Sequence, residues 1–534
     1  MNILFINGNI HSLDENNSTY EVLGIKDNTI SFLGHKSDIK NVQHEYEKII
    51  NLDNKVMLPS FNDSHMHLLG YGYFKSKLNL SNCTSIDNLI TESKNYIIYN
   101  KLNKNDMLIG RGWNQDNFKE KRIPTRLDLD KISTEIPIIL KRACGHISIC
   151  NSKAIELLKT TNECLENNHI NLEKGLFSED GLNLLNSIIK NPSLEELKKM
   201  ILLTCNELLE NGITSVQSDD FCALPIRDCD IVLKAFSELS LENKLPVRVY
   251  EQCLFENISE FKMYLNNNKI KFHSGNNFFK IGPLKLLLDG ALGGRTALLN
   301  TPYEDDKNNL GIANLDKSTL DEFIKISNDN NMQVAVHAIG DKAIDWVLDS
   351  YEKFSEISNP LRHGIVHCQL TTKNSLNKMK KLNTLAYIQP IFLHYDLHIV
   401  ENRIGTEKAK DTYAFNTMNN MGISISSGSD CPVEHFNVMN GIHCAVNRTD
   451  LQNYPKNGWL PNEKLSVLDA LKSYTINGAY SSFEENIKGT LETGKLADMV
   501  VLDKDIFSIE SNKIKNINIL MTIVDGEIKV NKLI

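Results

Sequence analysis

Apolar positions along most of this chain repeat with two alternating periods. From Ser193 onward, segments with apolar residues three or four positions apart, typical of amphipathic helices, alternate with short apolar runs, typical of buried strands. This alternation favours an α/β fold with a parallel sheet, and the number of units favours a (β/α)8 barrel. The predicted strands span 213–217, 281–289, 333–337, 363–367, 385–390 and 423–430, and the predicted helices span 193–208, 319–327, 342–354, 371–382, 408–421 and 465–480.

Both ends of the chain carry a different pattern of short, alternating strands. In residues 1–57 a turn at Asp27-Asn28 separates two such runs, and in residues 488–534 a hairpin is indicated at Asp525-Gly526. We therefore expect the two ends to form one β module around a central domain at 58–487.

Residues 78–190 interrupt the regular pattern. They contain a helical face at 86–97, a buried strand at 136–140, and a loop at 110–118 that is rich in glycine and asparagine and carries Trp113. A long segment between the first strand of a core and its next element is where lids and specificity loops tend to lie. We predict an insertion of mixed helices and strands here.

One stretch, Val56–Gly70, places two histidines in an extended segment. His65 and His67 alternate along it, so the period of a strand puts both rings on the same face. The pattern is what a strand delivering two imidazoles to one metal ion would show. Two histidines on a strand also occur without any metal, so the remaining ligands must decide.

Further residues with metal-binding side chains stand where predicted strands end. The carboxyl ends of barrel strands meet at one mouth, so residues far apart in the sequence become neighbours there. Imidazole and carboxylate ligands suit Zn²⁺ or a similar divalent ion, which would lower the pKa of bound water to about 7. The residues at or after strand ends are His65, His67, Lys285, His337, His367 and Asp430.

Composition excludes several classes of protein. The chain has 534 residues, 41% hydrophobic content and a net charge of -9 without any block of lysine and arginine, so we expect no nucleic-acid partner. It contains no apolar run of the ~18 residues needed to cross a bilayer, and its eleven cysteines have no paired spacing. We expect a soluble, cytoplasmic protein with reduced thiols, and the sequence is compatible with a homodimer.

Several motifs taken together resemble a known family. In order, they are PSFNDSHMH, GRGWNQDNF, LDGALGGRTALL, VAVHAIGD, HGIVHCQ, SSGSDCPVE, TINGAY and GTLETGKLADMVVLD. The set resembles the amidohydrolase superfamily and, within it, the YtcJ-like branch (the amidohydrolase 3 group), which includes N-substituted formamide deformylase. The resemblance spans essentially the whole chain, and the ordered set is far more specific than any single motif.

The resemblance implies both a fold and a ligand set. The implied fold is a (β/α)8 TIM barrel at 58–487, with a small β-sandwich made from 1–57 and 488–534 and an inserted α+β segment at 78–190. One or two divalent ions are implied, with zinc expected, and Lys285 matches the position where two-metal members carry a carboxylated bridging lysine. The residues matching the other ligand positions are His65, His67, His337, His367 and Asp430.

Four further residues are candidates for binding a small-molecule substrate. Trp113 either shapes a lid or packs against the rest of the chain, and His146 lies in a motif of this branch where substrate contact and packing are both open. Asp289 either faces the substrate or only organises its loop with Arg295.

The implied activity is hydrolysis of a carbon–nitrogen bond other than a peptide bond, in an amide or an N-formyl or N-acyl compound. Asp430 would accept a proton from water and return it to the departing nitrogen. One alternative is deamination of a heterocycle, although deaminases usually keep a glutamate shortly after the histidine that matches His337. Another is a regulatory or binding protein that has kept the barrel, although the complete ligand set argues for an enzyme.

Overall fold

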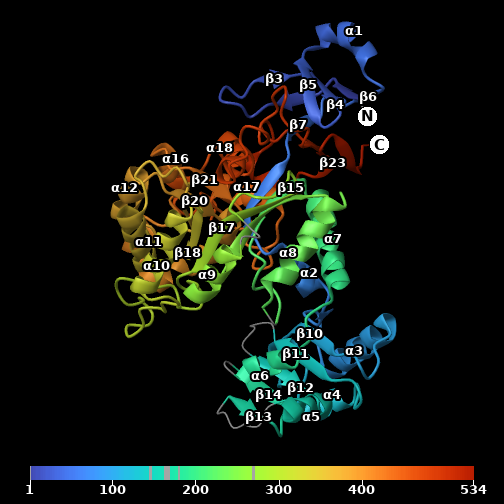
Figure 1. Cartoon of the computed structure of the whole chain (residues 1–534), viewed down its shortest axis with the longest axis vertical. Coiled ribbons are helices and arrows are strands. Elements are labelled where there is room, and N and C mark those ends of the chain that lie inside the picture. The colour runs from blue at the N-terminus through green and yellow to red at the C-terminus, as the bar shows by residue number, and fades with distance from the viewer. Residues whose placement is uncertain are drawn as a thin grey trace. The chain divides into compact units, whose positions relative to one another are not determined.

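The computed structural model describes residues 2–142, 147–161, 169–178, 181–225, 227–267 and 271–533 (Figure 1). The chain forms two compact units. The first comprises Met1–Leu68, Ile201–Phe221 and Phe236–Ile534, and the second comprises Leu69–Met200 and Cys222–Ala235.

The centre of the first unit is a sheet of eight parallel strands, which confirms the predicted α/β barrel architecture. Past the end of the last strand, the N–H of Asp430 donates to the carbonyl of His65, and the N–H of His67 donates to the carbonyl of Cys431. These bonds bring the last strand against the first and nearly close the ring. In sheet order the strands are β8 (Phe61–Met66), β15 (Ile213–Ser218), β16 (Arg248–Leu254), β17 (Phe279–Leu287), β18 (Val334–Ala338), β19 (Gly364–His367), β20 (Leu385–Ile388) and β21 (Ile425–Ser427).

Strand β16 is missing from the series predicted from the sequence. All of its residues are buried, yet Arg248, Glu251 and Gln252 interrupt the apolar run by which a buried strand is recognised. The barrel interior supplies partners for some of these polar groups. The Arg248 guanidinium, for example, pairs with Asp498, which directly precedes β22, and with Asp525, in the turn between β23 and β24.

Helices follow the strands much as the periodicity predicts. Two predicted helices are broken: 408–421 by Tyr413, whose φ is +47°, and 465–480 at Thr475, whose backbone is not helical. No helix within the described ranges is long and apolar enough to cross a bilayer. The helices include α7 (Leu194–Glu210), α8 (Cys229–Leu241), α9 (Ile258–Asn266), α10 (Lys317–Asp329), α11 (Asp341–Phe354), α12 (Lys373–Lys381), α15 (Thr406–Ala409), α16 (Phe415–Asn420), α17 (Val438–Asn447), α18 (Val467–Ser473) and α19 (Ile476–Ser481).

Strands from both ends of the chain share one sheet, in the order β24-β23-β22-β7-β2-β3, in which β7 pairs with β22 (Figure 1). A second sheet has the order β5-β4-β1-β6, and apolar residues of both sheets pack in one cluster. The predicted turns at Asp27 and Asp525 are present. That the two sheets form a β-sandwich stays a prediction. The strands are β1 (Ile3–Ile6), β2 (Asn9–His11), β3 (Thr19–Tyr20), β4 (Val22–Lys26), β5 (Thr29–Gly34), β6 (Lys48–Asn51), β7 (Val56–Pro59), β22 (Met499–Leu502), β23 (Ile519–Val524) and β24 (Glu527–Asn531).

The second unit contains a sheet of its own, in the order β13-β14-β12-β11-β10-β9. The prediction of a loop throughout 110–118 is wrong in its first half, because residues 110–113 complete β10, which pairs with a strand on each side. Helix α3 (Ile86–Asn100) matches its prediction and begins at the N-cap Ser85. The strands are β9 (Leu78–Asn79), β10 (Leu108–Trp113), β11 (Ile138–Arg142), β12 (Ile147–Cys150), β13 (Ile170–Asn171) and β14 (Leu176–Ser178).

Candidate metal centre

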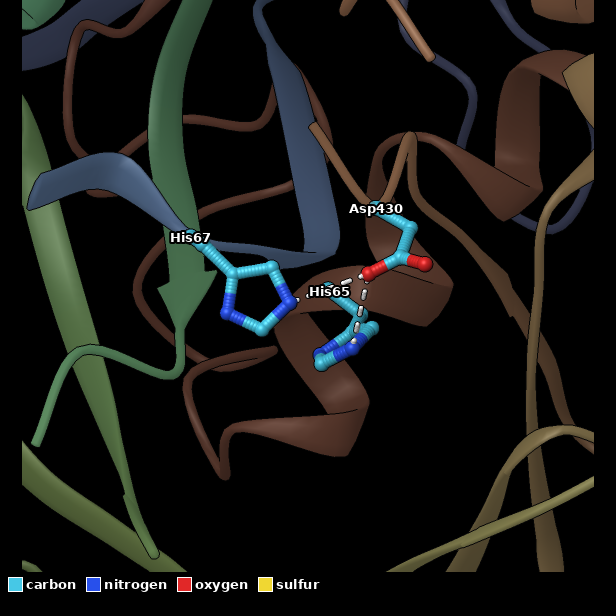
Figure 2. Close-up of side chains that lie close together, drawn as sticks. All are labelled: His65, His67 and Asp430. Atoms are coloured by element: carbon cyan, nitrogen blue, oxygen red, sulfur yellow. Dashed lines mark hydrogen bonds and ion pairs between the residues drawn. The ribbon is translucent and has the colours of Figure 1, made fainter. Parts of the chain in front are cut away.

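The end of β8 and the loop after β21 bring two histidines and an aspartate together (Figure 2). The Nε2 atoms of His65 and His67 lie 3.3 and 3.1 Å from the same carboxylate oxygen, Oδ1 of Asp430. The ligand atoms of all three residues lie within 4.8 Å of one another. His65 is 1% exposed, and the side chain of His67 is 31% exposed, so the cluster is buried on one side and open on the other.

Asp63 holds β8 and the Asp430 loop in register. Its carboxylate accepts hydrogen bonds from the N–H and the Oγ of Ser429, at 3.0 and 2.5 Å, and from the N–H of His65 at 3.2 Å. Burial raises the pKa of Asp63 to about 7 against the opposing effect of these bonds. The side chain therefore positions the ligands by linking their two backbones.

The rings of His367 and His337 extend the cluster from β19 and β18. The ring centroids of His65 and His367 are 5.5 Å apart, and those of His337 and His367 are 4.4 Å apart. Together with the 5.3 Å between His65 and His67, these distances make a continuous row of four imidazoles. The structure thus gathers at the barrel mouth the histidines that the sequence predicts there.

Each of the four rings has one nitrogen held by an oxygen acceptor. The Nδ1 of His65 donates to Gln252 Oε1, and the Nδ1 of His367 donates to Gln389 Oε1, both at 2.8 Å. The remaining two rings use main-chain carbonyls: His67 Nδ1 lies 2.8 Å from Asp219 O, and His337 Nε2 lies 3.2 Å from Gly290 O. An amide or carbonyl oxygen can only accept, so the other nitrogen of each neutral ring keeps its lone pair.

This arrangement fits a divalent cation. In their neutral forms His65 and His67 would turn the lone pairs of Nε2 toward the Asp430 carboxylate, a contact that needs a positive charge to offset it. Burial acts to lower the pKa of His67, but the hydrogen bond and charge of Asp430 outweigh it and raise the pKa to about 9. A proton can therefore supply that charge, and a divalent ion can replace the proton.

Lys285 and Asp219 form a buried pair beside the row of rings. The Nζ of Lys285 lies 3.5 Å from Oδ2 of Asp219, and neither side chain has a hydrogen-bond partner among the described residues. Lys285 is 0% exposed and Asp219 is 3% exposed. The two charges thus face each other in the interior without the further hydrogen bonds that usually compensate a buried ion pair for its lost hydration.

The four residues predicted to bind substrate lie in different surroundings. Trp113 is 0% exposed and donates its indole N–H to Leu140 O within the core of the second unit, so it packs rather than offering a surface to a substrate. Asp289 is buried and accepts three main-chain N–H groups, whereas Arg295 pairs with Asp305 and not with Asp289. His146 lies outside the described residues.

Residues that orient the histidines were not found from the sequence. Gln252 lies on the strand β16 that the pattern missed, Gln389 directly follows β20, and Asp219 directly follows β15. Asp219 and Gln389 each directly follow a strand, and that position is the signal by which the sequence could have indicated them. Glutamine and a main-chain carbonyl belong to no short metal-binding motif, so only the folded neighbourhood identifies them.

Comparison with known proteins gives a consistent result. A model of the amidohydrolase family matches residues 48–530. The chain is 29% identical to a putative amidohydrolase YtcJ from Bacillus subtilis over the full length of both chains, and 21% identical to an N-substituted formamide deformylase from Arthrobacter pascens over 99% of this chain and 98% of the relative. A solved structure of an uncharacterized metal-dependent hydrolase from Pyrococcus furiosus is similar, with a TM-score of 0.81, 29% identity, and coverage of 95% of this chain and all of the other.

Proposed function

This chain belongs to the amidohydrolase family, and from that membership and its cluster of histidines we propose that it hydrolyses a non-peptide carbon–nitrogen bond of a small molecule. Amides and N-formyl or N-acyl compounds are the proposed substrates. The observation that carries the proposal is the set of four imidazoles, each with one nitrogen held by an amide or main-chain oxygen, while the Nε2 atoms of His65 and His67 face the carboxylate of Asp430. That state of the ring is the one required for binding a metal ion.

We assign the ion to His65, His67, His337, His367 and Asp430, with zinc as the expected metal. A divalent ion in such a site supplies a Lewis acid that polarises an amide carbonyl and makes water more acidic.

Asp430 is proposed to move the proton. Its Oδ1 already lies at hydrogen-bond distance from the two ring nitrogens of β8, and its side chain remains 10% exposed, so water and substrate can approach it. Asp430 would accept a proton from the attacking water and donate it to the departing nitrogen, which could not leave as an anion.

Lys285 is proposed as the bridge to a second ion, in the form of a carbamate made with CO₂. Its support is the buried Nζ, which lacks a hydrogen-bond partner within the described part of the chain. A carbamate has two oxygens, which can join two cations about 3.5 to 4 Å apart. A mass increase of one CO₂ on the intact native protein, lost after acid treatment and absent from Lys285→Ala, would establish the modification.

Replacement of Asp430 by asparagine tests the proposed proton transfer. We expect Asp430→Asn to reduce hydrolysis of amides and N-formyl amines by about 10²–10⁴-fold, because the amide side chain cannot accept the proton. Turnover would be measured on a panel of small amides together with an amino-substituted heterocycle, and bound metal by elemental analysis.

The matched control is Asp349→Asn, which changes an exposed aspartate on α11 and should leave turnover unchanged. Near-normal amide hydrolysis by a metal-loaded Asp430→Asn protein would refute the role of Asp430. Release of ammonia from the heterocycle alone would point to a deaminase instead.

A further inference from the structure

An exposed leucine stands at the barrel mouth beside the row of histidines. On β17, side chains alternate between the two faces of the sheet, so Leu287 shares the inner face with Lys285, two residues earlier. Lys285 is 0% exposed, Leu286 on the other face is 0% exposed, and Leu287 is 39% exposed. Leu287 is therefore the residue of this strand that the open end of the barrel leaves in contact with solvent.

The register of the sheet places Leu287 next to a proposed metal ligand. Leu287 on β17 pairs with His337 on β18, one step beyond the pair of Leu286 with Val336. Paired residues of neighbouring parallel strands point to the same face. The leucine side chain and the His337 ring thus project side by side from the inner face of the mouth.

A second apolar side chain adjoins the row of histidines from the segment after β20, and β18 and β19 lie between β20 and β17 in the sheet. The ring of Phe392, in the turn after β20, stacks on the ring of His367 with centroids 5.9 Å apart and an interplanar angle of 14°. Phe392 as a residue is only partly buried. Leu287 and Phe392 are thus each adjacent to one ring of the neighbouring pair His337 and His367.

The cationic side chains on the same stretch are unavailable to an acidic ligand. Lys285 is fully buried next to Asp219, and the guanidinium of Arg295 is bound to the carboxylate of Asp305 at 2.8 Å. Neither cation is therefore an unpaired group beside Leu287 that would bind an acidic ligand. Exposed apolar surface beside a polar centre is typical of a ligand-binding pocket.

We propose that Leu287 and Phe392 form an apolar subsite, and that the substrate carries an alkyl or aryl group that packs there while its amide reaches the histidines. This inference rests on the proposed metal centre and narrows its substrates to amides or N-acyl compounds with an apolar substituent.

The test uses metal-chelating ligands, so that binding is measured without turnover. Straight-chain alkyl hydroxamates from acetohydroxamate to octanohydroxamate would be titrated calorimetrically into zinc-loaded protein. We expect the affinity to rise about fourfold for each of the first added methylene groups, as expected for burial of apolar surface. Leu287→Asn should bind octanohydroxamate about tenfold more weakly than the parent and acetohydroxamate equally well.

Two further variants serve as controls. Leu203→Asn changes a leucine of similar exposure, 44%, on α7, and should bind the whole series like the parent. Leu287→Met keeps an apolar side chain and should retain the dependence on chain length.

The outcomes separate this inference from the proposed function. Affinities independent of chain length, or the same dependence in Leu287→Asn as in the parent, would overturn the subsite while leaving the hydrolase intact. A chain-length dependence that is reduced in Leu287→Asn, in a protein that hydrolyses no amide, would support the apolar subsite but contradict the proposed hydrolysis. If no hydroxamate binds, the metal centre fails, and the subsite proposal fails with it.

Discussion

Two uncharged glutamines set the state of two histidines at the centre. Gln252 and Gln389 each present an amide oxygen to an Nδ1–H, and this bond fixes both the tautomer and the direction of the ring. The histidines themselves are predictable, because they stand at strand ends in the sequence. The glutamines are not, because hydrogen bonding to a ring of a different strand leaves no local pattern.

Removal of one such oxygen should weaken metal binding while sparing the fold. We expect Gln252→Leu to lower zinc affinity by about 10–100-fold, since the Nδ1–H of His65 loses its acceptor and the ring is no longer held. Competition with a chromogenic chelator measures the change. Gln217→Leu is the control, because Gln217 is also a fully buried barrel glutamine but bonds Gly478 and Ser481 instead of a histidine. Equal affinities of the two variants would contradict the assignment.

At the scale of elements, Asp289 fastens the loop after β17 to the loop after β18. Its carboxylate accepts the N–H groups of Leu298, Ile339 and Gly340 at 2.8 to 3.0 Å. It also lies 3.4 Å from His337 Nε2, so the same side chain steadies a proposed ligand. The sequence left open whether Asp289 faces the substrate or organises its loop together with Arg295. The contacts support organisation of the loop, but Arg295 takes no part in it.

Loss of this carboxylate should loosen both loops. Asp289→Ala leaves three main-chain donors without their acceptor, and we expect the free energy of unfolding to fall by about 3 kcal/mol. Urea unfolding measures the total, and hydrogen exchange should accelerate at the amides of Leu298, Ile339 and Gly340. Asp305→Ala, which removes the partly exposed ion pairs of Asp305 with Arg295 and Arg403, should cost less than Asp289→Ala, about 1 kcal/mol. Unchanged exchange at the three amides would show that Asp289 does not hold them.

At the scale of the whole molecule, a buried ion network joins the C-terminal part of the chain to the barrel. Glu484, after α19, lies 2.7 Å from Lys280 of β17 and 2.6 Å from Lys488, which also bonds Ser215 of β15. Burial acts to raise the pKa of Glu484, but the charges and hydrogen bonds of the two lysines outweigh it and lower the pKa to about 2. The folded state therefore depends on this carboxylate remaining ionised.

The network predicts how stability changes with pH. Because the pKa of Glu484 is lower in the folded state than its ordinary 4.5, its contribution is complete above about pH 5 and is lost as the pH falls toward 2. We expect this group to account for a loss of about 3 kcal/mol over that range. Urea unfolding of metal-free protein at pH 5.5 and pH 3 covers about 2 kcal/mol of this loss, and the difference between the two pH values should shrink by about that amount in Glu484→Gln.

The same substitution should destabilise the protein at pH 7, since Lys488 would stay buried without a charged partner. Glu407→Gln, at an exposed pair with Lys410, is the control and should change neither value by more than about 1 kcal/mol. An identical dependence on pH in Glu484→Gln and the parent would rule out this origin.

The sequence by itself determined the alternation of helices and strands and the residues at strand ends, because both are set by local periodicity and chain order. It also placed the four histidines and Asp430 near one another, since the rule that parallel strands end at one mouth needs no coordinates. Only the tertiary structure decided what holds those rings, that β16 belongs to the barrel, and that Trp113 is buried while Leu287 is exposed. These features depend on neighbours supplied by other strands, and contact between distant segments exists only once the sheet has closed.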